Sequence, residues 1–283
     1  MLFYHGKIGK GTKMKILVID REDITARLMS RRLEPLGHKI TLEAAKNDAV
    51  DLLALEKHEM VFVDPSPLTS ARPLILNLRR STGHYPYIVQ MGHDLELTEA
   101  VQSGANAAIS KPFDNDILDV TIDNAKYLIS LINRLGDDSE DFPSAGGIIS
   151  KSAFNQLFLS AIDRADRYGE RTFIVFIGIT NYNEIAVAEG GSAADYKVAK
   201  LSKFLSRLRR QSDIIAQTEK YEYALLLQRP VYETEPNEAA NRFAESINGF
   251  SDLFKVDGIV PEVQVKLVDL PVGARIIEHN ITK

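Results

Sequence analysis

Short apolar runs alternate with helix-like segments over residues 15–135, and no other feature of the sequence constrains the fold as strongly. The runs at 15–19 (KILVI) and 60–63 (MVFV) are almost free of polar residues. Such runs are typical of strands that are buried on both faces of a sheet. Further strands are expected at 38–42, 87–90 and 107–109. The alternation predicts an α/β unit with a parallel sheet covered by helices on both sides.

Three polar residues follow predicted strands of this unit: Asp20, Asp64 and Lys111. In a parallel sheet the carboxyl ends of the strands form one rim, so these side chains are expected to meet there. A carboxylate can attack a phosphoryl donor when a divalent cation neutralises the crowded negative charge. A lysine can pair with the phosphoryl oxygens. The alternative, that these are ordinary loop residues, is weakened because all three types occur together and Pro112-Phe113 follows the lysine.

A family resemblance rests on three segments, which read ILVID at 16–20, VFVD at 61–64 and SGANAAISKPF at 103–113. On these segments the first part of the chain resembles the receiver domain of response regulators, which has a flavodoxin-like (βα)5 fold. The resemblance implies that Asp64 is the phosphoacceptor, Lys111 the family's invariant lysine and Asp20 the first of its paired acids. It also implies Mg²⁺ at Asp20 and Asp64, and a sensor kinase as a partner.

Three residues depart from the receiver pattern. The second of the paired acids is Arg21, the switch hydroxyl is replaced by Met91, and the switch aromatic is replaced by Ala108. An arginine places positive charge where the cation should lie and cannot coordinate a metal. The resemblance therefore favours a receiver used as a docking or dimerising module over one switched by phosphorylation.

The last helix of this unit is expected to be long. Over 113–135 it carries apolar residues at spacings of four and three, a heptad-like pattern typical of helix pairing. We expect its end either to pair with another subunit, which favours a homodimer, or to pack on the second domain. The predicted boundaries are a flexible tail at 1–13, the receiver domain with its extended helix at 14–135, a linker at 136–148 and a second domain at 149–283.

The second domain alternates helices with strands and a central hairpin, which predicts an α+β, palm-like sheet. The segments 149–179 and 212–227 resemble the GGDEF domain, the diguanylate cyclase module. A cyclase needs two magnesium ions, and its signature glycines let the backbone approach the phosphates of GTP. In this chain the signature positions hold Glu219, Lys220, Tyr221, Glu222 and Tyr223. The metal-binding aspartate is replaced by Gly178, so the resemblance predicts a degenerate domain without cyclase activity.

Arg210-Gln211-Ser212-Asp213 matches the RxxD product-inhibition site of the GGDEF family at the expected distance before the signature. Arginine can bind phosphate or stack on guanine, and aspartate can accept hydrogen bonds from the guanine edge. Arg210 and Asp213 are therefore candidate cyclic di-GMP ligands. The alternative is a charged helix end followed by a turn residue.

Composition narrows the class of protein. A formal net charge of −5 gives no general attraction to nucleic acid or to anionic membranes. The absence of cysteine and of any apolar run of about 18 residues fits a cytoplasmic protein outside the membrane. The leading hypothesis is a non-catalytic signalling protein that acts through protein contacts, with a kinase or a downstream signalling protein as partner. A cyclic di-GMP effector and a regulator phosphorylated at Asp64 are the alternatives.

Overall fold

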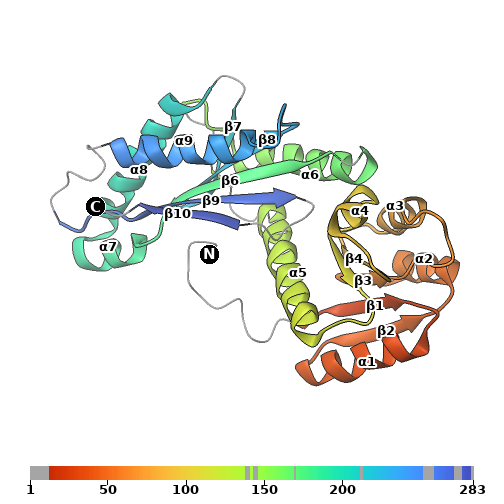
Figure 1. Cartoon of the computed structure of the whole chain (residues 1–283). Coiled ribbons are helices and arrows are strands. Elements are labelled where there is room, and N and C mark those ends of the chain that lie inside the picture. The colour runs from red at the N-terminus through yellow and green to blue at the C-terminus, as the bar shows by residue number, and fades with distance from the viewer. Residues whose placement is uncertain are drawn as a thin grey trace.

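The computed structural model describes residues 13–137, 141–142, 146–168, 170–210, 213–250, 258–270 and 276–281. The first unit is a parallel sheet in the order β2-β1-β3-β4-β5 (Figure 1). Its strands are β1 (Lys15–Ile19), β2 (Lys39–Glu43), β3 (Met60–Val63), β4 (Tyr87–Gly92) and β5 (Ala107–Ser110). This strand order is the flavodoxin-like one, and it confirms the fold expected from the alternating sequence.

Helices cover both faces of this sheet because neighbouring strand residues point in opposite directions. Ile16 and Val18 of β1 pack in one cluster with α1 (Asp23–Leu33) and α5 (Asn115–Gly136). Leu17 and Ile19 pack in the cluster on the opposite face. That face is covered by α2 (Lys46–Leu55), α3 (Arg72–Ser81) and α4 (Leu97–Gln102). A short 3-10 helix, η1 (Glu34–Leu36), ends at Gly37, whose positive φ of 89° suits glycine.

The second unit is an antiparallel sheet in the order β10-β9-β6-β8-β7, which confirms the α+β class. Its strands are β6 (Thr172–Ile179), β7 (Ile214–Glu219), β8 (Glu222–Gln228), β9 (Val263–Leu270) and β10 (Ile276–Ile281). Its helices are α6 (Lys151–Tyr168), α7 (Tyr182–Glu189), α8 (Gly191–Leu208) and α9 (Glu235–Gly249). The sequence predicts neither α7 nor β10, and it predicts a final strand only over 263–267, three residues shorter than β9.

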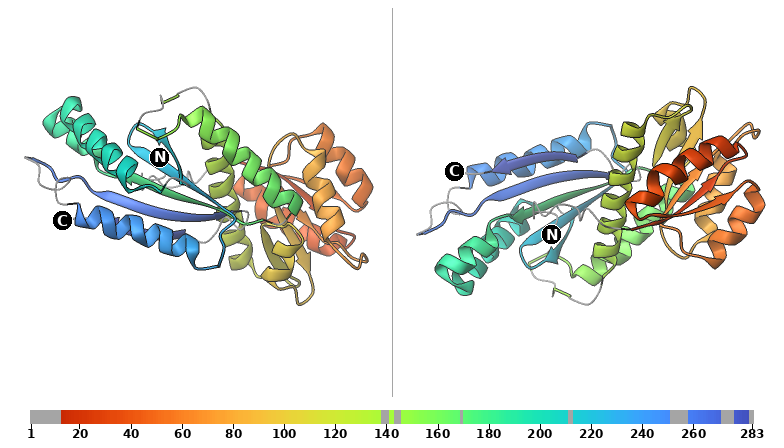
Figure 2. Two further views of the ribbon diagram at one scale, coloured as in Figure 1. Left: turned by 90° about the horizontal axis from the view of Figure 1, so that it is seen from above. Right: turned by 90° about the horizontal axis from the view of Figure 1, so that it is seen from below.

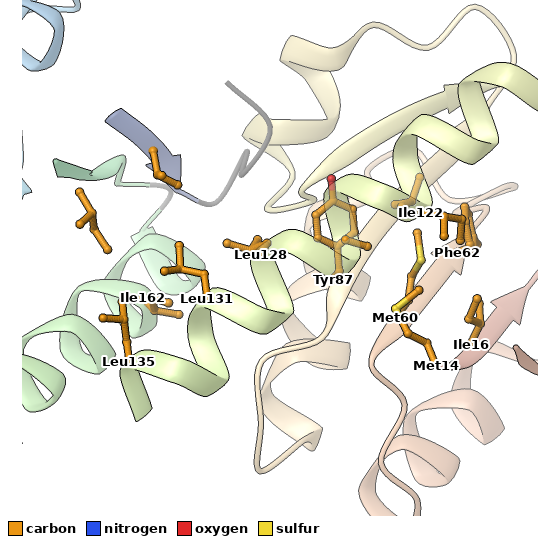
Figure 3. Packing of buried hydrophobic residues seen from close by; sticks show 14 of the residues in the cluster. Met14, Ile16, Met60, Phe62, Tyr87, Ile122, Leu128, Leu131, Leu135 and Ile162 are labelled. Atoms are coloured by element: carbon orange, nitrogen blue, oxygen red, sulfur yellow. The ribbon is translucent and has the colours of Figure 1, made fainter. Parts of the chain in front are cut away.

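Helix α5 is shared by the two units (Figures 1 and 2). Leu118, Ile122 and Ala125 are buried with the strands of the first sheet. Further along the same helix, Leu128, Leu131 and Leu135 belong to the same continuous cluster as residues of α6 and of the second sheet, and Leu131 and Leu135 lie beside Ile162 (Figure 3). Of the two expectations for the end of this helix, packing on the second domain is therefore the one seen.

The predicted tail and linker are only partly described. Residues 1–12 of the tail, and 138–140 and 143–145 of the linker, lie outside the described residues. Gly136, expected to begin the linker, is the last residue of α5. At the other end of the predicted linker, Ile149 pairs with Ala216 beside the second sheet. In the part of the chain that is described, no helix combines the length and the apolar character needed to span a bilayer.

Candidate functional site

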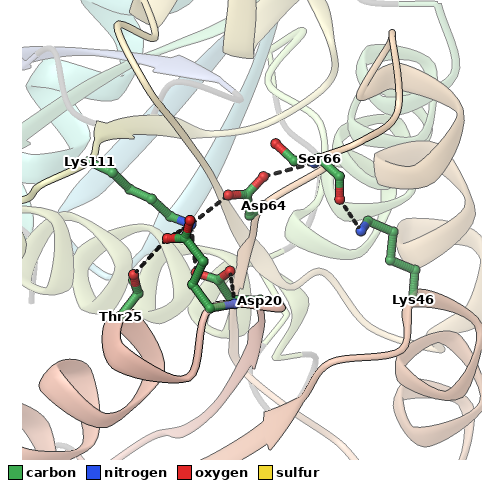
Figure 4. Close-up of polar contacts among 7 residues, drawn as sticks. Asp20, Thr25, Lys46, Asp64, Ser66 and Lys111 are labelled. Atoms are coloured by element: carbon green, nitrogen blue, oxygen red, sulfur yellow. Dashed lines mark hydrogen bonds and ion pairs between the residues drawn. The ribbon is translucent and has the colours of Figure 1, made fainter.

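The carboxyl ends of β1, β3 and β5 bring Asp20, Asp64 and Lys111 together, as the sequence predicted (Figure 4). The Nζ atom of Lys111 lies 2.8 Å from Oδ2 of Asp20 and 2.5 Å from Oδ2 of Asp64. All three side chains are largely buried, with exposed fractions of 4%, 1% and 9% for Lys111, Asp20 and Asp64. The lysine is thus the centre of a compact ionic cluster at the rim of the sheet.

Two further groups of this cluster were not foreseen. The Oε2 atom of Glu22 lies 3.2 Å from Nζ of Lys111, and the Glu22 amide donates to Oδ1 of Asp20 at 2.8 Å. The Nζ atom of Lys46, at the start of α2, donates to the backbone carbonyl of Ser66 at 2.6 Å (Figure 4). In the sequence, Glu22 and Lys46 are marked only by their position next to the end of a strand or helix. Many polar residues have such a position, so the sequence alone could not identify these two as members of the cluster.

Asp64 and Lys111 each have one protonation state near neutral pH. Burial alone would raise the pKa of Asp64, but hydrogen bonds from Lys111 and Ser66 outweigh it and hold that pKa below its ordinary value. Burial would likewise lower the pKa of Lys111, but its bonds with Asp20 and Asp64 raise that pKa. Asp64 is therefore ionised and Lys111 is protonated.

Positive charge also gathers at the exposed side of the cluster. Burial and the nearby charge of Arg21 lower the pKa of Lys46, while Asp64 and Asp20 act in the opposite direction. Lys46 therefore lies within electrostatic range of both carboxylates and of Arg21. Met91, at the position expected for a switch hydroxyl, is fully buried in the hydrophobic core. Its side chain supplies no hydroxyl to this rim.

The hairpin of β7 and β8 holds the five residues at the signature positions, and its turn is Lys220-Tyr221. The Lys220 ammonium lies 3.0 Å from Oδ1 of Asp195 on α8. Tyr221 stacks on Tyr182 with ring centroids 4.7 Å apart, and the Tyr182 hydroxyl donates to Asp195 at 2.6 Å. The turn is therefore closed onto α7 and α8 by contacts between its own side chains and theirs.

Glu222, the retained acid of the signature, is completely buried. Its Oε1 atom accepts from the Arg134 guanidinium of α5 at 2.6 Å and from the Thr218 hydroxyl at 2.8 Å. The same guanidinium lies 3.5 Å from Oε1 of Glu219 and over the ring of Phe176. On the neighbouring strand Gly178 is paired with Glu222, so no second carboxylate lies beside it on β6. Tyr223 points to the opposite face, where it is buried in the other core cluster.

Arg210 and Asp213 lie together at the start of β7. The Arg210 amide donates to Oδ2 of Asp213 at 2.8 Å. The guanidinium of Arg242, on α9, reaches the same oxygen at 3.1 Å. The three residues line a cavity of about 240 Å³ together with Tyr232 and Glu238. Arg242 is a further member of the site that the sequence interpretation missed, since only the packing of α9 brings it there.

The second unit can be assigned by sequence. Residues 144–267 match the family model described as diguanylate cyclase, GGDEF domain. The C-terminal unit is a GGDEF domain. Its antiparallel sheet, with α6 on one face and α8 and α9 on the other, carries the signature hairpin at the end of two adjacent strands. The curated proteins contain no significant match to the sequence.

Solved receiver structures are similar to the N-terminal unit. A two-component response regulator from Clostridium difficile is 23% identical, with a TM-score of 0.36, over 40% of this chain and 94% of that chain. The receiver domain of a sensor histidine kinase from Pseudomonas aeruginosa PAO1, with a magnesium ion in its active site cleft, is 18% identical, with a TM-score of 0.36, over 40% and 98%. The receiver domain of an HD domain-containing protein from Pseudomonas fluorescens Pf-5 is 19% identical, with a TM-score of 0.38, over 42% and 91%.

The chain thus combines a unit of flavodoxin-like fold with a domain of the diguanylate cyclase, GGDEF family. In this GGDEF domain the signature hairpin contacts α5, which begins in the first unit and ends against the second. The hairpin is thus joined to α5 by the contact between Arg134 and Glu222.

Proposed function

We propose that this chain is a non-catalytic signalling protein that acts through protein contacts. The observation that carries the proposal is the burial of Glu222 beneath Arg134. A carboxylate that is completely buried and paired with an arginine is poorly placed to bind a magnesium ion at the surface of the sheet. The acid retained from the signature thus holds α5 against the GGDEF domain.

The neighbouring side chains support the same proposal. A cyclase must admit the triphosphate of GTP and two divalent cations next to the hairpin. Here Lys220 and Tyr221 fill the turn and are held by Asp195 and Tyr182. The positions of the two signature glycines, whose lack of a Cβ would let a phosphate approach the backbone, hold Glu219 and Lys220. The turn of the hairpin is therefore occupied by side chains that contact α7 and α8.

The proposal is tested by incubating the full chain with GTP and Mg²⁺ or Mn²⁺ and measuring cyclic di-GMP by chromatography. We expect no product above a blank without protein, and an active cyclase assayed in parallel controls for the conditions. Gly178→Asp restores one missing carboxylate but leaves Glu222 covered, so we expect this variant to stay inactive. Turnover of GTP by the unchanged chain would overturn the proposal.

A second candidate function is the binding of cyclic di-GMP as an effector. It is favoured by the cavity in which exposed Arg210 lies beside Asp213, with Arg242 at the same carboxylate. Two guanidinium groups and one carboxylate can recognise both a phosphate and the edge of a guanine. Calorimetry with cyclic di-GMP should then show binding that Arg210→Ala abolishes. Arg207→Ala, at an exposed arginine of α8, is the matched control. Absence of heat at tens of micromolar ends this candidate.

The third candidate is phosphorylation of Asp64 by a sensor kinase. The ionised state of Asp64 and its contact with Lys111 favour it. Incubation with acetyl phosphate, followed by intact-mass measurement, should then add one phosphoryl group that Asp64→Asn lacks. An unchanged mass in the full chain counts against this candidate.

A further inference from the structure

The pocket at Asp64 contains its own counter-charges. Asp20, Glu22 and Asp64 supply three carboxylates, and all three converge on the ammonium of Lys111 within 3.2 Å. Lys46 reaches the loop after Asp64 through the Ser66 carbonyl, and Arg21 directly follows Asp20 in the chain, so both add positive charge next to the cluster. Three carboxylates are thus accompanied by three cationic side chains, and their formal charges sum to zero.

Several oxygen atoms that a metal would need already contact cations or amides of the chain. Mg²⁺ is held by carboxylate and carbonyl oxygens in a tight octahedral shell. The carboxylates of Asp20 and Asp64 contact Lys111, and the carbonyl of Ser66, in the loop after Asp64, accepts from Nζ of Lys46. The Ser66 amide in turn donates to Oδ1 of Asp64 at 2.8 Å (Figure 4). Among the described residues no group of three or more His, Asp or Glu side chains is arranged to hold a metal ion.

We propose that Lys46 and Arg21 take the place of the divalent cation in this pocket, so that its charge is balanced by the chain itself. The ammonium of Lys46 ties the loop after Asp64 to α2 through the Ser66 carbonyl. Arg21 adds positive charge on the same side. A dication entering the pocket would meet three positive side chains within a low-dielectric rim, where like charges repel strongly. This inference is independent of whether the GGDEF domain is catalytic.

The test compares the melting temperature of the full chain in 10 mM MgCl2 and in EDTA. Mg²⁺ bound in this pocket should raise the melting temperature only while Asp20 is present, so the rise that an Asp20→Asn variant lacks is the quantity to compare. For the unchanged chain we expect this Asp20-dependent rise to be below one degree. In Arg21→Asp/Lys46→Ala, which removes both cations and supplies a carboxylate, we expect Mg²⁺ to raise the melting temperature by a few degrees, again only while Asp20 is present.

Lys39→Ala, at an exposed lysine of β2 at the opposite end of the strands, is the matched control and should behave like the unchanged chain. If the double variant does not fold, Lys46→Gln keeps most of the side chain without its charge and should show part of the same gain. The proposal is overturned by an Asp20-dependent shift of several degrees in the unchanged chain. It is equally overturned if variants lacking the Lys46 charge fold but remain insensitive to Mg²⁺.

Discussion

Arg134 and Glu222 form an ion pair between α5 and the signature hairpin, with exposed side-chain fractions of 14% and 1%. Removing one partner of a buried pair costs about 3–5 kcal/mol, because the other charge stays buried without compensation. We therefore expect Arg134→Ala to lower the free energy of unfolding by about that amount in urea denaturation.

The exposed Arg207→Ala serves as the reference and should cost less than about 0.5 kcal/mol. A double variant, Arg134→Met with Glu222→Gln, should recover much of the loss, since it removes both charges and keeps similar volumes. A loss from Arg134→Ala no larger than that of the reference would show that the pair does not hold the two units together.

Two buried histidines make stability depend on pH in the neutral range. Burial lowers the pKa of His38 and of His58 below the ordinary value of about 6.5. The Met14 amide donates to Nδ1 of His38 at 3.3 Å, which requires that nitrogen to be unprotonated. Below about pH 6.5 the unfolded chain then binds more protons than the folded one. The contribution of these two histidines to the free energy of unfolding is therefore fully present above about pH 6.5, and it is lost as the pH falls through their pKa values in the folded chain.

We therefore expect the urea midpoint to fall between pH 7.5 and pH 5.5, and the fall to be smaller in His38→Gln/His58→Gln. His93→Gln, at an exposed loop histidine, should leave the pH dependence unchanged. Asp64 does not affect this comparison. Its pKa is lowered, so its contribution to the free energy of unfolding is lost only below about pH 4. A midpoint equal at the two pH values would contradict this reading of the histidines.

At the level of elements, α5 decides whether the two units unfold together. Leu131 is 2% exposed within the cluster that contains both sheets, and truncating a buried leucine to alanine costs about 2–5 kcal/mol. We expect Leu131→Ala to lower the melting temperature and to separate a single calorimetric transition into two. Ile117→Ala, on the same helix but 53% exposed, should do neither. Two well-separated transitions in the unchanged chain would show that the shared core does not couple the units.

Most of the helices and strands were predictable from the sequence, and there are physical reasons why the others were missed. The buried runs of β1 and β3 are nearly all apolar because both faces are covered, so they are visible in sequence. Helix α7 is eight residues long and has no strong apolar stripe, which leaves little periodicity to detect. The end of α5 was ambiguous because pairing with another subunit and packing on a second domain require the same apolar spacing.

The site residues of the first unit were predictable where a strand end fixes their position. Asp20, Asp64 and Lys111 follow three strands of one parallel sheet, so the topology alone brings them together. Lys46 and Arg134 meet their partners across 20 and 88 residues of sequence. Such contacts depend on how helices pack on the sheets, and no local pattern records that.

For the whole molecule, the expected homodimer stays a prediction. Leu128, Leu131 and Leu135 of this helix are used in packing on the GGDEF domain, so a helix pair would have to use another face of α5. Ile117 and Val120 lie one turn apart on that helix and are 53% and 60% exposed. If they form the interface, Ile117→Glu/Val120→Glu should halve the mass measured by light scattering, whereas Leu55→Glu, at an 85% exposed leucine of α2, should not. A dimer that survives the double variant excludes this face.

The shared helix also means that the boundary between the domains in sequence is not a boundary in space. A cut after residue 137 would leave Leu128, Leu131 and Leu135 on the first fragment without the α6 surface that covers them. The second fragment would lose the guanidinium that neutralises Glu222. Chimeras that exchange either domain at the apparent linker would therefore inherit an uncovered leucine stripe and an uncompensated charge. Grafts that carry α5 together with the GGDEF domain would keep the leucine stripe covered and Glu222 paired, but they would expose Leu118, Ile122 and Ala125, which pack on the first sheet.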